Sequence, residues 1–253
     1  MFALERREKI YDYILRNKNV TVLELSQKLN VSEVTIRKDL GFLESQQLID
    51  RTFGGAIIKS KIIREKSYFE REKSMMDEKY LVGKKASEFV KANSTIILDA
   101  GTTTMEMAKC IKHIENLKVL TNDLKIGVFL SDFSNIKVTL IGGKVSKKSK
   151  QCTGIEACRE VEKYNVDASF LGCDAFDMEN GFMTTSIEKM YLKNCFIKAA
   201  KKSFLLTSSD KYQKKSIVKV QPLNILTGIV VDRQSEKLIE DFNKFNMDNC
   251  VFV

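Results

Sequence analysis

The spacing of apolar residues divides the first 58 positions of the chain into three helices followed by a hairpin. Apolar residues recur every three or four positions along three segments, which is the period of an amphipathic helix. These segments are residues 3–17, 22–30 and 33–46. Two short apolar runs then flank Gly54 and Gly55, and this arrangement is typical of a β-hairpin. Three helices and a hairpin in so short a stretch indicate a winged helix-turn-helix.

The third of these segments is the one on which a functional interpretation depends. Ser32 stands where an N-terminal helix cap is expected. Val34, Leu40 and Leu43 are expected to point inward, with Ile36 at the margin of the apolar face. The polar positions of the helix are then left for solvent or for a partner.

From residue 94 onward, short apolar runs alternate with amphipathic segments. The expected strands are residues 94–100, 117–121, 136–143, 167–173, 203–209 and 225–232. The expected helices are residues 104–112, 123–131, 154–164, 186–202 and 235–245. Continuous apolar strands separated by helices indicate a Rossmann-like α/β fold, in which helices cover both faces of a parallel sheet. We therefore expect a winged helix-turn-helix over 1–58, a charged linker over 59–76 and a larger α/β domain over 77–253.

Composition narrows the chemistry that this chain is expected to perform. The net charge of +9 favours a polyanionic partner. His113 is the only histidine, so neither a zinc site nor a histidine-dependent catalytic arrangement is expected, and we expect no catalytic residues, metal or cofactor. The cysteines form no C-x-x-C pair and are expected to be reduced. No apolar run reaches the roughly 18 residues of a membrane span, and no signal-peptide core follows the first residues, so we expect a cytoplasmic protein without a membrane partner.

Polar residues near the start of the third helix are suited to DNA. A recognition helix enters the major groove with its N-terminal end first, so its first two turns meet bases and phosphates. The candidate DNA-binding residues are Ser32, Thr35, Arg37 and Lys38, together with Arg51 near the hairpin. Arginine binds guanine through two hydrogen bonds, and lysine suits phosphate. Asp39 is expected to be structural, because its carboxylate would repel phosphate.

Two other interpretations of this unit stay open. Residues 1–60 hold ten Lys and Arg against eight Asp and Glu, so bulk charge alone does not indicate nucleic acid. Arg37 and Lys38 would then be a solvated helical face, or the winged unit would bind a protein.

The run that ends in Asp99 leads into a turn with the chemistry of an anion site. Gly101 is expected to let the backbone turn tightly, so that successive N–H groups point at one anion. Thr102, Thr103 and Thr104 add hydroxyl donors, and the following helix offers its positive N-terminus. A strand-to-helix turn with threonine caps is the structural alternative. Neither G-x-x-x-x-G-K-[ST] nor G-x-G-x-x-G occurs, so nucleotide binding of those kinds is not expected.

Further polar residues and glycines follow the other expected strands, whose carboxyl ends meet at one edge of a parallel sheet. These candidates are Thr121, Asn122, Gly142, Gly143, Asp174 and Lys211, with Glu188 at the start of a helix. Lys211 is suited to neutralise a phosphate, and Asp174 to accept hydrogen bonds from sugar hydroxyls. Glu188 is a second possible acceptor, although acidic residues also favour helix starts for structural reasons.

Both parts of the chain resemble the DeoR family of bacterial transcription regulators. At the N-terminus the resemblance rests on "VSEVTIRKDLGFLE" and "LIDRTFGGAI", and it implies that the five DNA-binding candidates contact an operator. At the C-terminus it rests on the Asp99-x-Gly101-Thr102-Thr103 turn, Thr121-Asn122, Gly142-Gly143, Gly154, "FLGCD", Gly181, Glu188 and Lys211. The family's sensor domain is similar in fold to ribose-5-phosphate isomerase and CoA transferases. In the family this domain binds phosphorylated sugars, and that binding usually lowers the affinity of the regulator for DNA.

The chain also departs from the family pattern at several positions. Phe53 stands where the family commonly has histidine before the glycine pair. The usual Asp-x-Ser-Lys reads "SSDK", with Ser208 at the aspartate position and Asp210 at the serine position. Ala175 replaces a frequent glycine, and Lys189 follows Glu188 where a small residue is common.

We therefore expect a transcription regulator and not an enzyme, most simply a repressor of a sugar-catabolism operon. It would bind double-stranded operator DNA as a homodimer or homotetramer, and a phosphorylated sugar effector would modulate that binding. The alternative is a phosphosugar isomerase-like enzyme with an appended DNA-binding module, in which Asp174, Glu188 and Lys211 perform acid–base chemistry. A third interpretation makes the winged unit a protein-interaction module on an inert scaffold.

Overall fold

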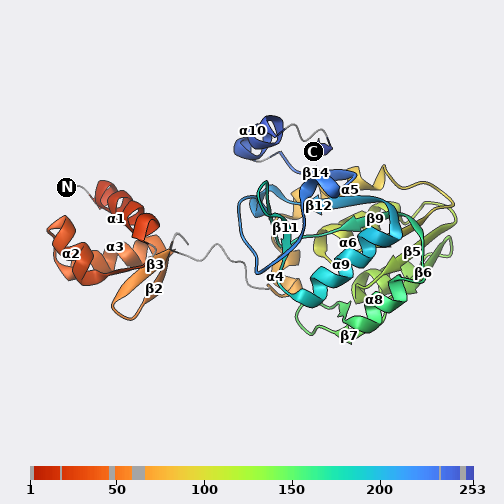
Figure 1. Ribbon diagram of the computed structural model, residues 1–253, viewed down its shortest axis with the longest axis horizontal. Coiled ribbons are helices and arrows are strands. Elements are labelled where there is room, and N and C mark those ends of the chain that lie inside the picture. Colours follow the sequence, from red (N-terminus) through yellow and green to blue (C-terminus); the bar gives the residue numbers. More distant parts are fainter. Residues whose placement is uncertain (1–2, 18, 46–48, 59–65, 234, 246–248) are drawn as a thin grey trace. The chain divides into compact units, whose positions relative to one another are not determined.

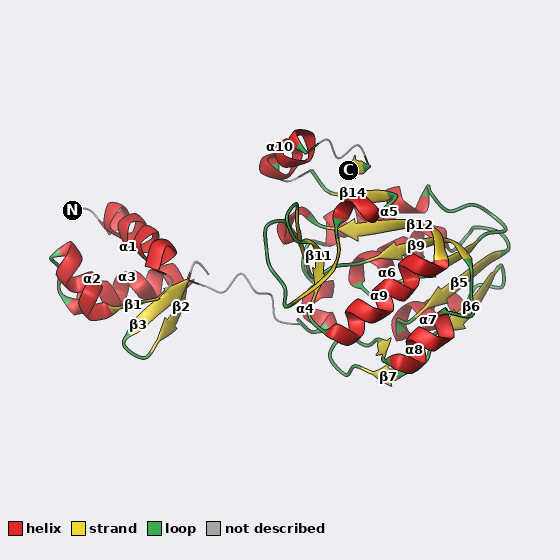
Figure 2. Ribbon diagram, in the orientation of Figure 1, coloured by secondary structure: helices red, strands yellow, loops and turns green. Residues whose placement is uncertain are grey.

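The computed structural model describes residues 3–17, 19–45, 49–58, 66–233, 235–245 and 249–253 (Figure 1). The chain separates into two compact units, Met1–Lys61 and Ile62–Val253, which we name the N-terminal unit and the C-terminal unit. The smaller unit carries three helices and a small sheet, whereas helices and strands alternate through the larger one (Figure 2).

The N-terminal unit combines three helices with a three-stranded antiparallel sheet, which confirms the predicted winged helix-turn-helix. The helices are α1 (Ala3–Asn17), α2 (Val22–Leu29) and α3 (Glu33–Ser45), and the strands are β1 (Asn19–Thr21), β2 (Ile49–Thr52) and β3 (Gly55–Ile58). The sheet order is β1-β3-β2, so a third strand that the apolar pattern does not predict joins the hairpin. With three residues, β1 is too short to show a strand period.

The approach of β1 explains why a glycine begins β3. A Cβ atom on Gly55 would lie 2.1 Å from the carbonyl oxygen of Val20, so a larger residue does not fit while Thr21 pairs with Gly55. Gly54 has a φ of 88°, which favours glycine, and it forms the turn together with Phe53. The turn therefore lies one residue earlier than the predicted Gly54-Gly55 pair.

The buried face of α3 differs from the predicted one. Ile36 is fully buried, in one cluster with Leu40 and Leu43. Val34 is 60% exposed, so the prediction that it points inward is wrong. A helix turns by about 100° per residue, so Val34 lies about 200° around the axis from Ile36 and cannot share its face.

A seven-stranded parallel sheet forms the centre of the C-terminal unit and confirms the predicted α/β class. The strands are β4 (Thr95–Leu98), β5 (Leu117–Thr121), β6 (Ile136–Leu140), β9 (Val166–Leu171), β12 (Ala200–Thr207), β14 (Gly228–Val231) and β15 (Cys250–Phe252). Their order is β15-β14-β12-β9-β4-β5-β6, and every neighbouring pair is parallel. Strand β15, at one edge, is not among the predicted strands.

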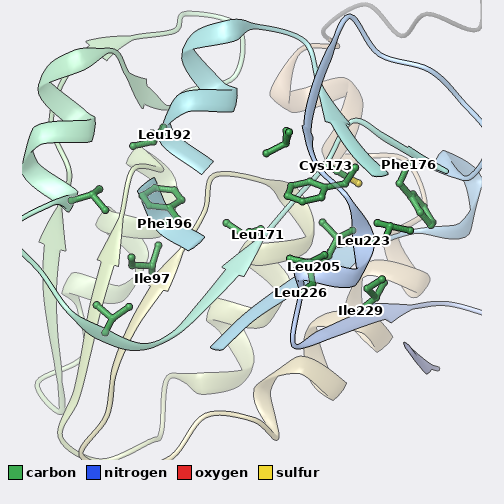
Figure 3. Close-up of a cluster of buried hydrophobic side chains, with 14 of the residues drawn as sticks. Ile97, Leu171, Cys173, Phe176, Leu192, Phe196, Leu205, Leu223, Leu226 and Ile229 are labelled. Carbon is green, nitrogen blue, oxygen red and sulfur yellow. The ribbon is translucent and has the colours of Figure 1, made fainter. Parts of the chain in front are cut away.

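Helices pack on both faces of this sheet. One face carries α5 (Met76–Ser87), α6 (Thr102–Ile111) and α7 (Leu124–Ser131), and the other carries α8 (Ile155–Val161), α9 (Ile187–Ala199) and α10 (Glu236–Lys244). Side chains of β4 alternate between the two cores, because successive residues of a strand point to opposite faces. Ile97 packs with Leu171 and Phe196 on the α9 side (Figure 3), whereas Ile96 and Leu98 belong to the other core. The apolar strands are therefore buried on both faces.

Two small sheets lie beside the central one and are not predicted by the apolar pattern. They are β10 (Ala175–Asp177), β11 (Gly181–Thr184) and β13 (Val218–Gln221), and the ribbon of β7 (Lys144–Val145) and β8 (Cys152–Thr153). None exceeds four residues, which is too few for a period. At the start of β11, a Cβ on Gly181 would lie 2.0 Å from the carbonyl oxygen of Gln221, so this close crossing requires glycine.

Part of the segment predicted as a linker is folded. Helix α4 (Tyr68–Glu72) begins at a capping box in which Ser67 accepts from Glu70 N–H at 3.3 Å and the Glu70 carboxylate accepts from Ser67 N–H at 2.7 Å. Tyr68 is buried, and its N–H donates to the Lys148 carbonyl at 2.9 Å. This helix is therefore anchored to the C-terminal unit, while residues 59–65 of the predicted linker lie outside the described residues.

Candidate functional sites

The order in which the chain adds strands to the central sheet reverses between β4 and β9, which are neighbours in the sheet. After β4 it continues to β5 and β6 on one side, and after β9 it continues to β12 and β14 on the other. In open parallel sheets, ligands bind outside the carboxyl ends of the strands at such a switch point. The predicted anion turn after β4 and Asp174 after β9 both lie at this place.

A buried ion pair joins the two loops at the switch point. The N–H of Gly172 donates to Asp99 Oδ2 at 3.0 Å. The Lys193 ammonium contacts the same carboxylate oxygen and donates to the Gly172 carbonyl at 2.8 Å. Asp99 and Lys193 are both buried. Lys193 comes from α9, 94 positions further along the chain, and no signal in the sequence pairs it with Asp99.

The N-terminus of α6, directly after β4, presents N–H groups that lack protein acceptors in the described part of the chain. The first N–H of this helix with a backbone acceptor is that of Met105, which donates to the Gly101 carbonyl at 3.0 Å. The cap residue is Gly101, which has no side chain to accept from the helix. The N–H groups of Thr102, Thr103 and Thr104 are therefore left for a ligand, and the helix dipole makes this end positive.

The hydroxyl groups of the three threonines differ in their partners. Thr104 Oγ1 donates to the Gly101 carbonyl at 2.9 Å, so it serves the turn itself. The hydroxyls of Thr102 and Thr103, both buried residues, make no hydrogen bond to any described residue. The chain bends at Ala100 and Gly101, but Gly101 has a φ of 169°, which is extended backbone, so its conformation does not itself require glycine. A Cβ at Gly101 would instead lie only 3.2 Å from Thr104 Oγ1.

Asp174 lies after β9 as an ionised carboxylate. The Thr184 hydroxyl and the Thr185 N–H donate to its Oδ2 at 3.0 and 3.2 Å. Burial by itself would raise the pKa of Asp174, but the charges of nearby basic groups, Lys189 first among them, hold the pKa below its usual value. The carboxylate is therefore suited to accept hydrogen bonds from ligand hydroxyls, and it is a weak base for removing a carbon-bound proton.

Lys211 comes from a short turn after β12 and is directed to the same loop. Its Nζ donates to the Cys173 carbonyl at 2.9 Å. In the same turn, the Ser208 hydroxyl donates to Asp210 Oδ1 at 2.5 Å, and the Lys214 ammonium lies 3.1 Å from Asp210 Oδ2. Ser208 and Asp210, which stand in each other's place relative to the family pattern, are thus hydrogen-bonded to each other. Lys211 stays at the family's lysine position.

Two basic residues that the sequence reasoning missed lie at the same site. The Lys79 ammonium of α5 contacts the carbonyl oxygens of Arg71 and Ser74. Burial, together with the nearby charge of Lys211, lowers the pKa of Lys79 to about 8. The buried Nε of Arg71 has no hydrogen-bond partner within the described ranges, and its charge contributes to the low pKa of Asp174. A buried guanidinium N–H without an acceptor is suited to an anionic ligand.

The predicted residues after β5 order the loop that leads into α7. Thr121 Oγ1 accepts from Asp123 N–H at 3.1 Å, and Asn122 Nδ2 donates to the Cys152 carbonyl at 3.0 Å. Asp123 caps α7 and also accepts from Gly101 N–H at 3.2 Å, which links this loop to the anion turn. Asn122 Oδ1 is buried without a partner among the described residues, so this amide retains an acceptor for a ligand.

Gly142, Gly143 and Glu188 lie nearer the surface than the residues around Asp99. Gly143 has a φ of 143°, and a Cβ there would lie 2.6 Å from the Thr153 carbonyl oxygen, so packing against β8 explains the glycine. Gly142 is exposed, with open space around it. The Glu188 carboxylate is exposed and lies 3.5 Å from the Lys144 ammonium. The roles of these three residues toward an effector stay predictions.

The predicted DNA-binding residues of α3 lie at its N-terminal end. Ser32 caps the helix by accepting from Thr35 N–H at 3.3 Å, and the two hydroxyl oxygens are 2.9 Å apart. Arg37 is exposed and donates to Glu33 Oε2 at 2.8 Å, while Lys38 is exposed. The structure therefore presents both basic side chains on the solvent face of the helix.

The candidate residues of the wing are exposed, whereas Asp39 of α3 is buried. Arg51 of β2 is exposed, and Phe53 at the wing tip is fully exposed. Asp39 is buried and accepts from Arg6 Nε at 2.5 Å and from Arg7 Nε at 2.9 Å. It ties α1 to α3, which confirms its predicted structural role.

Among the described residues there is no cluster of metal ligands, no disulfide bond and no helix that could span a membrane. The described ranges contain no group of three or more His, Cys, Asp or Glu that could hold a metal ion. All six cysteines are free thiols. No helix in the described part of the chain is long and apolar enough to cross a membrane.

A winged helix that presents exposed Arg37 and Lys38, joined to an α/β unit with a candidate anion site at its switch point, is the arrangement expected of a ligand-responsive DNA-binding regulator. Residues 6–61 match the DeoR-like helix-turn-helix domain, and residues 74–233 match the DeoR C-terminal sensor domain. The chain belongs to the DeoR family of HTH-type transcriptional regulators, and the predicted resemblance is confirmed.

Relatives of similar length support this assignment. The HTH-type transcriptional regulator YulB of Bacillus subtilis is 34% identical over 245 residues, covering 95% of each chain. The regulator GolR of Listeria innocua is 32% identical over 97% of this chain and 96% of its own. The HTH-type transcriptional repressor GlcR of Bacillus subtilis is 30% identical over 92% of this chain and 90% of its own. These relatives are regulators of transcription.

Solved structures similar to this chain are more distant. Ribose 5-phosphate isomerase from Plasmodium falciparum is 15% identical with a TM-score of 0.39, over 53% of this chain and 52% of that one. The eIF2B beta subunit of Chaetomium thermophilum is 9% identical with a TM-score of 0.45, over 60% of this chain and 50% of that one. The chain spans about half the length of these structures.

Proposed function

We propose that this protein represses a sugar-catabolism operon by binding double-stranded operator DNA, and that a phosphorylated sugar bound to the C-terminal unit weakens that binding. The DeoR-like helix-turn-helix match supports the DNA-binding part, and one relative is itself named a repressor. The chemistry at the switch point supports the ligand class. Operator DNA and phosphorylated metabolites meet in the cytoplasm, where we place the protein.

The observation that carries the proposal is an open helix N-terminus beside a cluster of basic groups. Thr102 and Thr103 supply N–H and hydroxyl donors, and Arg71, Lys79 and Lys211 supply positive charge. A helix N-terminus is a ready anion site, and charge-assisted hydrogen bonds to phosphate are the strongest available. A phosphate dianion satisfies both the donors and the charge.

Acceptors near this turn suit the rest of a sugar phosphate. Asp174 is ionised, and Asn122 Oδ1 is buried without a partner in the described structure. Both accept hydrogen bonds, as sugar hydroxyl groups require. A ligand with a phosphate at one end and hydroxyl groups along its length therefore fits better than inorganic phosphate alone.

The DNA end uses the exposed residues of α3 and the wing. Arg37 and Lys38 would enter the major groove together with Ser32 and Thr35, and Arg51 would reach the neighbouring backbone. A homodimer or homotetramer would place two recognition helices roughly 34 Å, or a multiple of that distance, apart. An operator with two inverted half-sites at this spacing is the expected target.

Effector binding must favour one of two states of the protein for DNA affinity to change. Arg71 lies on α4, the first helix of the C-terminal unit in the described chain. A phosphate that binds the Arg71 guanidinium would hold α4 against the site. The segment that leads to the N-terminal unit begins just before α4, so this helix is the proposed element through which the two ends are coupled.

Thermal unfolding of the full chain against a panel of sugar phosphates and their unphosphorylated forms tests the ligand. A ligand at about 100 times its Kd adds about 2.7 kcal/mol, which raises Tm by several degrees. Lys211→Ala should lose the shift and the release of DNA but keep operator binding. Lys214→Ala, in the same turn but paired with exposed Asp210, is the matched control and should keep both. A folded protein that no phosphorylated sugar stabilises, and whose DNA binding none affects, would refute the proposed ligand class.

A further inference from the structure

One apolar side chain stands exposed on the DNA-facing end of α3. Val34 is the second residue of the helix and is 60% exposed. Arg37 and Lys38 follow it by three and four positions, so the three side chains share one face of the helix. The core of the unit is made by Ile36 and Leu40 on another face. Val34 therefore lies among the DNA-binding candidates and outside the core.

The fold itself gives no reason for valine at this position. Valine has a lower helix propensity than alanine, because its branched side chain loses rotamer freedom in a helix. Single exposed apolar residues are common on protein surfaces, so exposure alone does not indicate a functional role for Val34. The position decides, since the first turn of a recognition helix is the part that approaches the base edges.

The major groove offers an apolar group only at thymine. Adenine, guanine and cytosine present hydrogen-bond donors and acceptors there, whereas thymine also presents its C5-methyl group. A valine side chain makes no hydrogen bonds, so its favourable contact in the groove is with that methyl. Arg37 on the same face is suited to guanine, so the two side chains would read different base pairs.

We propose that Val34 determines part of the operator sequence by packing on the C5-methyl group of one thymine in each half-site. This inference rests on the proposed operator binding and adds a base that the polar candidates do not read. Desolvation of one methyl group corresponds to about a fourfold change in affinity. The contact is therefore modest at one half-site and is multiplied when both half-sites of a dimer are occupied.

Replacement of single thymines by deoxyuridine isolates the proposed contact. The full chain is first used to select its operator from random DNA. Each thymine of the selected half-site is then replaced in turn by deoxyuridine, which removes the methyl group and leaves every hydrogen-bonding group in place. At one position the replacement should weaken binding by the wild-type protein about fourfold per half-site. Val34→Ala, which lacks the two methyl groups of valine, should lose most of this difference between the thymine and deoxyuridine operators.

Leu23→Ala is the matched control, because Leu23 on α2 is also an exposed apolar residue, at 54%. This variant should keep the wild-type sensitivity to deoxyuridine. A selected operator at which no deoxyuridine weakens binding, or at which Val34→Ala stays as sensitive as the wild type, overturns the role of Val34 alone. Failure to select any DNA sequence would overturn the proposed function as well. Val34→Ala should fold normally, since the side chain lies outside the core.

Discussion

The ion pair between Asp99 and Lys193 leads to the most specific prediction about stability. Lys193→Met removes the ammonium and keeps a side chain of similar length, so the variant creates no large cavity. The Asp99 carboxylate then stays buried between β4 and β9 with the Gly172 N–H, 3.0 Å away, as its remaining donor from that loop. The perturbation is therefore an uncompensated buried charge.

Breaking a buried ion pair from one side costs about 3–5 kcal/mol, because the remaining charge has neither water nor a partner. The side chains of Lys193 and Asp99 are 8% and 2% exposed, so water reaches neither well. The Gly172 N–H still stabilises the carboxylate, so we expect a loss near the lower end, about 3 kcal/mol. The double variant Asp99→Asn with Lys193→Met removes both charges and should recover at least half of this loss.

Native-state hydrogen exchange of the full chain reports this loss for the C-terminal unit alone. Amides of β4 and β9 lie in the centre of the sheet, and such amides exchange only by large-scale unfolding. Their protection should fall by the stated amount in Lys193→Met and recover in the double variant. A loss below about 1 kcal/mol would refute the argument that this ion pair is effectively desolvated. Asp99→Asn alone completes the cycle, and additive effects of Asp99→Asn and Lys193→Met would show that the charges do not interact.

Three further predictions follow from the two sites. Arg37→Ala should weaken binding to the specific operator by about 1–3 kcal/mol in a fluorescence titration, whereas an equal loss on unrelated DNA would make Arg37 a phosphate contact. Effector affinity, measured by calorimetry, should fall as pH rises through about 8, because Lys79 has a pKa of about 8 and a neutral amine no longer attracts the phosphate. Lys79→Arg should remove that fall, because arginine stays charged, and an unchanged slope would count against Lys79 as the group responsible. Asp39→Ala should destabilise the N-terminal unit by about 2–3 kcal/mol, judged by exchange of α1 and α3 amides, because Arg6 and Arg7 lose the buried carboxylate that joins these helices. A change below about 0.5 kcal/mol would show that both guanidinium groups recover their hydration.

The fold class was predictable because apolar residues recur at helical spacing in the N-terminal unit and form continuous runs, separated by amphipathic segments, in the C-terminal unit. The three helices of the N-terminal unit and the apolar strands of the parallel sheet each repeat their pattern over several turns or residues. The strands that were missed are β1, β15, the β10-β11-β13 sheet and the β7-β8 ribbon, and helix α4 within the predicted linker was missed as well. These short strands form by pairing with a neighbouring segment of the folded chain. Gly55 and Gly181, for example, lack the Cβ atom that would prevent a second strand from approaching closely.

The assignment of Val34 and Ile36 shows the limit of periodicity within one helix. Both residues are apolar and β-branched, and a pattern that contains both does not say which one the core takes. Packing of α3 against α1 and β2 buries Ile36 with Leu40 and Leu43. Val34 is therefore left exposed and available to contact DNA, which the apolar pattern does not predict.

The sequence by itself determined the winged helix-turn-helix, the alternation of strands and helices in the C-terminal unit and the candidate anion turn at Asp99, because each depends on residues that are neighbours along the chain. The tertiary structure decided which side chains surround that turn. Lys193 reaches Asp99 across 94 positions, and Arg71 and Lys79 come from before the first strand of the sheet. Parallel strands bring the loops of distant segments to one edge, so the charge around a site at that edge is a property of the folded chain. No local pattern records which lysines converge there.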